Sequence, residues 1–255
     1  MHHHSKRTAL AAACTAAAIG LVGCGTATKD AGKSPSAAPV TSKPAAKEPF
    51  AGLSGPRIAD KALAATRSAS SMTLRFDGTS DGEHITAGMA LDKRGDCVGD
   101  LTMPQGGIRI IKTGDTAYMK YDDAMWKSQG KDGATAASVI GDRWIKTSAA
   151  DPDFKDLGSM CDLEELLAGF DGDTEGSQKG RLTVLDGKPV VPLVEKDGKE
   201  VSTAYIAAEG KPYILKITTE GGKEPGTAEF ADYDKPVNAQ APSPKNAVDL
   251  AKLGG

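Results

Sequence analysis

Histidine, aromatic side chains and long apolar runs are all scarce in this sequence of 255 residues. Three of its four histidines stand at positions 2–4, so His84 is the only one further along the chain. The sequence has no H-E-x-x-H zinc motif, no G-x-G-x-x-G dinucleotide motif and no phosphate-binding P-loop. With no second histidine in the domain, His84 is most simply a solvated residue at the start of a strand. The chain is therefore expected to be no enzyme, and to bind no cofactor and no metal.

Positive charge is not in excess either, because 31 lysines and arginines face 34 aspartates and glutamates, and the net charge is -3. Loss of a leader that carries Lys6 and Arg7 and no acidic residue would take the net charge to -5. Such a chain has no basic footprint for nucleic acid and no polybasic patch for a membrane surface. With 30 glycines and only 5% aromatic residues, it suits short strands and turns better than a helical bundle.

The first 24 residues have the parts of a bacterial lipoprotein signal. A positive stretch with Lys6 and Arg7 precedes an apolar run of roughly 14 residues, which is shorter than the ~20 that a membrane-spanning helix needs. The run ends in Leu21-Val22-Gly23-Cys24, which resembles a lipobox. In a lipobox the signal is cut before the cysteine, and its thiol and amine then carry diacylglycerol and a fatty acid such as palmitate. We expect loss of residues 1–23 and anchoring through Cys24 at the extracytoplasmic face of the cell membrane.

Three regions follow this signal. Residues 24–50 are rich in Ser, Pro, Ala and Lys and poor in bulky apolar groups, which predicts a disordered tether. Residues 51–240 are long enough for one domain with its own core. Residues 241–255 form a proline-punctuated tail, in which a short helix is expected over 245–253.

Two of the four cysteines remain for the mature domain, because Cys14 lies in the signal and Cys24 in the lipobox. An oxidising compartment allows the other two, Cys97 and Cys161, to form a disulfide. Closure of a loop of about 65 residues would stabilise the fold by about 4 kcal/mol. The alternative is that both are free, buried thiols.

The apolar pattern predicts a helix followed by two sets of strands. Ser54 and Pro56 suit a helix start, and Ile58, Ala62 and Leu63 continue at helical spacing. From Met72 onward the period changes to two, and glycine-containing turns break it every 8 to 14 residues, as in an antiparallel meander. Strands are expected at 72–76, 85–91, 97–103, 108–110, 117–121, 143–146, 180–185, 190–195, 201–207, 213–218 and 227–233. Between the two sets, short helices are expected over 134–140 and 160–170, the second starting with a capping box of Asp162 and Glu165.

The order of several segments resembles the LppX/LprAFG family of actinobacterial lipoproteins. These segments are Ser71-Met72-Thr73-Leu74 after the first helix, Gly114-Asp115-Thr116-Ala117-Tyr118-Met119-Lys120 followed by Trp126, Arg143-Trp144-Ile145-Lys146, and the run from Gly210-Lys211-Pro212-Tyr213 to Asp234-Lys235-Pro236-Val237. The likeness spans about residues 55–245. It implies an α+β fold like that of LolA and LolB, in which a curved antiparallel sheet, a half-barrel of roughly ten strands, wraps around a few helices. It also implies an apolar cavity that takes up acylated lipids.

The resemblance leads to a functional hypothesis, a monomeric lipoprotein that binds or carries a lipid or acyl ligand. Strand phase alone selects the candidate lining of the cavity: Leu74, Phe76, Met89, Leu91, Leu101, Ile108, Ile110, Met119, Leu215 and Ile217. The alternative is an anchored envelope protein without a cavity, which acts as a structural or interaction partner of another protein. Low aromatic content and a long tether favour that alternative.

Overall fold

The structure, a computed structural model, describes residues 48–151, 154, 158–168 and 174–252. Every described residue belongs to one compact unit, Ala46–Gly255. The predicted signal, the lipidation of Cys24 and most of the predicted tether therefore lie outside the described residues. In the described part, every helix is too short or too polar to cross a bilayer.

Helix α1 (Gly55–Ser68) opens the domain, as the sequence predicts. Ser54 stands at its N-cap and Pro56 in its first turn, where the missing N–H costs nothing. Ile58, Ala62 and Thr66 are fully buried and recur at four-residue spacing, which gives the helix one face that packs on the sheet. The helix ends where Ala69 turns to an extended conformation.

The first strand set is a meander in which each strand pairs with the next, as the period of two predicts. Hairpin β1–β2 turns at Asp81-Gly82, and both residues have positive φ (53° and 81°), a conformation that aspartate and glycine tolerate. The strands of this set are β1 (Ser71–Ser80), β2 (Glu83–Asp92), β3 (Cys97–Met103), β4 (Gly106–Thr113) and β5 (Thr116–Tyr121).

Two consecutive short helices join the first strand set to β6 (Trp144–Ser148). Asp122 caps α2 (Asp123–Ser128), because its Oδ1 accepts a 2.7 Å hydrogen bond from the Met125 N–H. Helix α3 (Gly130–Ile140) follows directly. The sequence predicts only part of α3 and not α2, which is too short to show a helical period.

The second strand set adds its strands to the open edge of β1. It comprises β7 (Gln178–Lys179), β8 (Thr183–Leu185), β9 (Lys188–Asp197), β10 (Glu200–Ala207), β11 (Ile214–Glu220) and β12 (Gly226–Ala231). The path through the sheet is β13-β6-β5-β4-β3-β2-β1-β12-β11-β10-β9-β7, and β8 pairs with β9 off this path. The predicted α+β fold with a large, mostly antiparallel sheet is confirmed. The sheet is open, and the described residues contribute 13 strands to it rather than roughly ten.

Two local predictions were wrong. Of the expected strand over 180–185 only Thr183–Leu185 (β8) forms, and β7 (Gln178–Lys179) precedes it. The ladder is interrupted between the two because Pro192, opposite Gly180, has no N–H to continue it. The expected helix over 245–253 is instead a pair of short 3-10 turns (Pro244–Asn246 and Leu250–Lys252) around β13 (Ala247–Asp249). Strand β13 pairs in parallel with the edge strand β6 and buries Val248, a tertiary contact that a local pattern cannot reveal.

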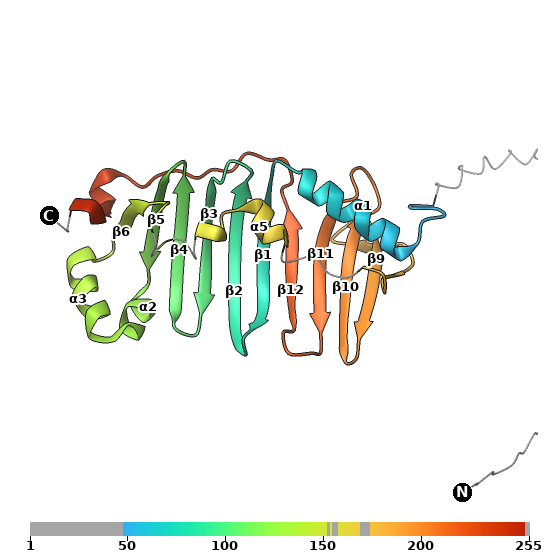
Figure 1. The fold of residues 1–255 in the computed structure, drawn as a ribbon, viewed down its shortest axis with the longest axis horizontal. Coiled ribbons are helices and arrows are strands. Elements are labelled where there is room, and N and C mark those ends of the chain that lie inside the picture. Colours follow the sequence, from blue (N-terminus) through green and yellow to red (C-terminus); the bar gives the residue numbers. More distant parts are fainter. Residues whose placement is uncertain (1–47, 152–153, 155–157, 169–173, 253–255) are drawn as a thin grey trace, which may run out of the picture. The chain divides into compact units, whose positions relative to one another are not determined.

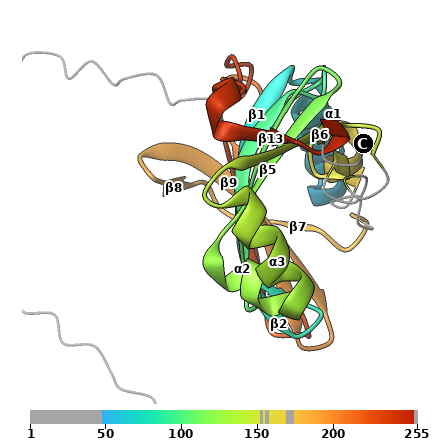
Figure 2. The same ribbon diagram turned by 90° about the vertical axis from the view of Figure 1, so that its left-hand side faces the viewer.

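Helices α1 and α5 (Leu163–Ala168) lie over one face of the sheet, which we call the inner face (Figures 1 and 2). The β8–β9 hairpin projects from the opposite, outer face (Figure 2). Asp162 caps α5 as predicted, since its Oδ1 accepts hydrogen bonds from the N–H groups of Glu164 (2.9 Å) and Glu165 (3.0 Å). One hydrophobic core links the inner face to both helices and includes Ile58, Met72, Leu91, Ile110, Trp126, Phe154, Leu163 and Leu167.

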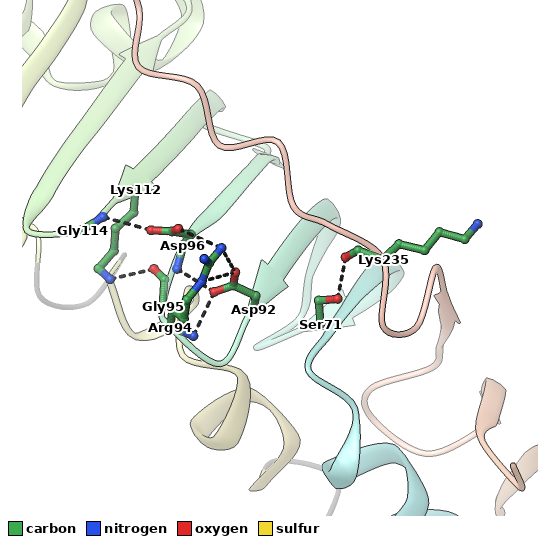
Figure 3. A network of polar contacts seen from close by, with 8 residues as sticks. All are labelled: Ser71, Asp92, Arg94, Gly95, Asp96, Lys112, Gly114 and Lys235. Atoms are coloured by element: carbon green, nitrogen blue, oxygen red, sulfur yellow. Dashed lines mark hydrogen bonds and ion pairs between the residues drawn. The ribbon is translucent and has the colours of Figure 1, made fainter.

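A buried carboxylate fixes the β2–β3 turn next to Cys97 (Figure 3). Asp92 is only 6% exposed, and its oxygens accept hydrogen bonds from the backbone N–H groups of Arg94 (2.9 Å) and Asp96 (3.1 Å). The Arg94 guanidinium adds two bonds to Asp92, of 3.0 and 2.8 Å. Lys112 closes the network by donating to the Gly95 carbonyl at 2.6 Å. The turn therefore holds β3 in place for the disulfide described below.

Candidate ligand-binding cavity

A cavity of about 380 Å³ lies between α1 and the inner face of the second strand set. Its lining comes from three sources: the underside of α1, the short segment before β7, and strands β9 to β11. The residues are Ala59, Ala62, Leu63, Thr174, Ser177, Leu193, Glu195, Glu200, Ser202, Ala204, Ile206, Ile214 and Ile217. Small side chains on both walls, Ala59 and Ala62 on the helix and Ala204 on the sheet, leave the space open.

Strand register decides which side chains reach this cavity. Leu193 is opposite Ala204, and Ala204 is opposite Ile217, so the three share the inner face. A β-bulge shifts the register after Tyr205, so that Ile206 pairs with Ile214 and Leu215 is the extra residue. The bulge therefore keeps both Ile214 and Ile217 on the inner face, although they are three residues apart.

The cavity changes from apolar to polar along β10. Ile206 and Ala204 lie toward one end, and Ser202 and Glu200 toward the other, a span of six residues or about 20 Å. Glu195 of β9 stands directly opposite Ser202 and adds a second carboxylate to the polar end. The Ser202 hydroxyl lies 3.2 Å from that of Thr219 on β11. Such a gradient matches a ligand with an apolar body and a polar end.

Buried hydrogen bonds fix α1 above the sheet. Thr66 is fully buried, and its Oγ1 accepts a 3.1 Å hydrogen bond from the Ile214 N–H. The Tyr233 hydroxyl donates to the Ile214 carbonyl, and its burial raises the pKa of this phenol well above the usual value. The helix and the first residue of β11 are thus joined at the apolar end of the cavity.

Asp234 ties together the end of α1 and the start of β11. Its carboxylate accepts hydrogen bonds from the Tyr213 hydroxyl (2.7 Å), the Ser70 N–H (2.8 Å) and the Lys211 ammonium (3.0 Å). These donors hold the pKa of Asp234 well below its usual range. Tyr213 in turn stacks on Tyr233, with ring centroids 4.0 Å apart.

The lowered pKa of Asp234 predicts a pH-dependent stability. A carboxylate with a lower pKa in the folded state stabilises the protein above its unfolded pKa of about 3.9, and loses that contribution as pH falls. We expect Asp234→Asn to unfold at lower urea than wild type at pH 7, and the gap to shrink below about pH 4. Asparagine tolerates the left-handed backbone of this position (φ 60°), so the change isolates the charge. Asp60→Asn on the exposed side of α1 is the control, and a gap independent of pH would contradict the prediction.

The sequence-predicted lining residues lie mostly elsewhere. Six of them are buried in the core that fills the inner face of the first strand set, namely Leu74, Met89, Leu91, Ile108, Ile110 and Met119. Phe76 is partly buried against that core. Only Ile217 lines the cavity beneath α1.

The remaining two predicted lining residues, Leu101 and Leu215, belong to other hollows. Leu215 faces the outer side because of the bulge in β11, and lies near Arg75 and Lys188 of a small hollow of about 200 Å³. Leu101 borders a hollow of about 630 Å³ at the other end of the sheet, which charged residues such as Arg109 and Asp142 dominate. Its larger volume does not make that hollow a lipid site, because its charged lining would have to be desolvated by an acyl chain.

Sequence reasoning missed most of the true lining, including Leu193, Ala204 and Ile206. The signal was present, since Ser202, Ala204 and Ile206 alternate with Thr203 and Tyr205 and include small residues where a filled core needs bulk. The pattern identifies the inner face but does not say where a gap remains between that face and the helix above it.

The predicted disulfide is present. Cys97 of β3 is bonded to Cys161, which stands just before α5, and their Cα atoms are 5.4 Å apart. Both cysteines are buried. The bond fastens α5 to the sheet at the first strand set, away from the cavity beneath α1.

One histidine and one serine in the first hairpin deserve comparison with hydrolase sites. Gly78-Thr79-Ser80-Asp81-Gly82 fits the pattern G-x-S-x-G, and His84 Nε2 lies 3.0 Å from Asp77 Oδ1. His84 pairs with Thr79, so Ser80, one residue on, points to the opposite face of the sheet. Both the histidine and Asp77 are largely exposed, and the hairpin is no strand-to-helix elbow.

Across the described ranges, no three His, Cys, Asp or Glu side chains are grouped to hold a metal ion.

The open sheet, with helices on one face and a cavity beneath α1, is an α+β fold similar to that of the solved structure of LprF. Among solved structures, LprF from Mycobacterium bovis matches with a TM-score of 0.52 at 13% identity, over 76% of this chain and 99% of LprF. The Mycobacterium tuberculosis lipoprotein LppX matches with a TM-score of 0.46 at 15% identity, over 72% of this chain and 97% of LppX. No model of a known protein family and no curated protein matches the sequence. The likeness to LprF confirms the predicted resemblance for the fold.

Proposed function

We propose that the protein is a lipoprotein, anchored through Cys24 on the extracytoplasmic face of the cell membrane, that binds the acyl chain of a lipid beneath α1. The cavity between α1 and strands β9 to β11 is the observation that carries this proposal. Its volume of about 380 Å³ is near the lower end of the range for small-molecule sites, roughly 300–1,000 Å³, and therefore suits one chain rather than several.

Binding would be passive and would not involve catalysis. Each buried methylene contributes about 0.8 kcal/mol, so about ten methylenes would contribute roughly 8 kcal/mol before the cost of association. The lipobox of the sequence supports the anchor at Cys24. Such an anchor would keep the cavity within tether reach of a membrane that supplies such ligands. An envelope protein partner and a monomeric state stay predictions from the sequence.

A bulky residue inside the cavity should weaken uptake. We expect Ala204→Phe to weaken the binding of dodecyl glucoside, an uncharged single-chain probe, at least about tenfold, because the ring occupies the space of the chain. Isothermal titration calorimetry below the micelle concentration measures the change. Thr203→Phe, on the outer face of the same strand, is the matched control and should bind as wild type does.

A second variant keeps the proposal testable if the first variant fails to fold. Ala59→Phe blocks the same space from the helix side, and thermal unfolding of both variants reports whether they fold. Retained affinity in folded Ala204→Phe and Ala59→Phe would refute the proposal. So would a wild-type protein that binds no single-chain amphiphile and carries no lipid in native mass spectrometry after purification from its own membrane.

A further inference from the structure

The polar end of the cavity carries two carboxylates on neighbouring strands. Glu195 of β9 is opposite Ser202, and Glu200 lies two residues from Ser202 on the same face of β10. The two glutamates are therefore diagonal neighbours, about 7–8 Å apart at their backbones. Both are half-buried, so water screens them less than it would at an exposed surface.

No cation compensates these carboxylates within the described part of the chain. The lining residues include no lysine, arginine or histidine, and neither glutamate forms an ion pair or a side-chain hydrogen bond there. Lys196 stands between Glu195 and the turn but faces the outer side, as its pairing with Val201 shows. Lys179, the lysine of β7, is already engaged with Glu48 at 3.3 Å.

The backbone around the Glu200 carboxylate leaves it room at the rim of the cavity. A Cβ atom on Gly222, in the turn between β11 and β12, would lie 2.2 Å from Glu200 Oε2. Gly222 also has a φ of +68°, so glycine is the residue that suits this turn. The Glu200 carboxylate therefore packs against turn backbone, and no described side chain donates a hydrogen bond to it.

We propose, on the basis of the function proposed above, that the cavity selects lipids by the charge of their polar end. Uncompensated carboxylates repel an anionic head group and accept hydrogen bonds from hydroxyl or ammonium donors. The ligand is then a lipid whose polar end has hydrogen-bond donors and no negative charge, such as a glycosyl or amine head group. Free fatty acids and acidic phospholipids are poor ligands, although their chains fit the apolar end equally well.

Three probes with the same chain test the selection. Dodecyl glucoside, dodecylammonium and dodecanoate share their apolar part and differ in the head group. We expect dodecanoate to bind the wild-type protein about tenfold or more weakly than the other two, by calorimetry at pH 7. The comparison between glucoside and ammonium then distinguishes a sugar from an amine as the preferred donor.

Removal of the two charges should remove the selection. In Glu195→Gln/Glu200→Gln, dodecanoate is expected to bind within about threefold of dodecyl glucoside, while the affinity for the glucoside changes little. Glu209→Gln/Glu220→Gln makes the same change in net charge outside the cavity and should keep the wild-type order. Equal binding of all three probes to wild type, or an order unchanged in the cavity variant, would overturn this inference and leave the proposed function standing. If no probe binds at all, the proposed function itself fails.

Discussion

Replacement of both Cys97 and Cys161 by alanine is expected to lower the free energy of unfolding by about 4 kcal/mol. The disulfide joins residues 64 positions apart, and so restricts the unfolded chain over about a quarter of its length. It also holds α5 on the sheet. That helix has only six residues and could not be stable without tertiary contacts. Urea unfolding of the oxidised wild type and of Cys97→Ala/Cys161→Ala measures the difference.

Unfolding in a reductant separates the contribution of the cross-link to stability from that of the packing of the sulfur atoms. Wild type should lose most of its advantage when unfolded in dithiothreitol, because the loop constraint disappears while both side chains remain. The double alanine variant should not respond to the reductant. The same unfolding midpoint for oxidised wild type and the variant would contradict the prediction, as would two titratable thiols in the oxidised, denatured mature protein.

The fold could be predicted from local patterns wherever a strand or helix is long enough to repeat its period. Strands β1 and β2 show alternation over ten residues each, and α1 shows four-residue spacing from Ile58 to Thr66. Prediction failed where a distant partner decides the conformation. Val248 becomes a strand residue only because β6 has a free edge. The chain leaves the ladder after Gly180, whose N–H bonds to the Pro192 carbonyl, because Pro192 has no N–H to return the bond.

The cavity was harder to predict than the sheet. Strand phase correctly assigned Leu74, Met89 and Leu91 to the inner face, but a core and a cavity have the same phase. What separates them is which helix lies above and how large its side chains are. Ala59 and Ala62 leave a space over the second strand set, whereas the core residues of α5, Leu163 and Leu167, fill the first.

Leu91→Ala tests this division between core and cavity, and we expect it to lower the free energy of unfolding by about 3 kcal/mol. Leu91 is fully buried in the middle of the sheet, between Met72 of β1 and Cys97 of β3. Truncation removes apolar contacts and leaves a void that rigid neighbouring strands cannot close. Urea unfolding at pH 7 measures the effect.

The same variant tests whether Leu91 lines the ligand cavity, as strand phase predicts, or lies in the core, as the structure has it. If Leu91 lined the ligand cavity, its truncation would change the affinity for dodecyl glucoside. Because it lies in the core, we expect that affinity to stay within about twofold of wild type. Leu182→Ala is the matched control, since Leu182, just before β8, is 51% exposed and its truncation should change stability by less than about 0.5 kcal/mol. A stable Leu91→Ala protein with altered ligand affinity would place the binding site over the first strand set instead of beneath α1.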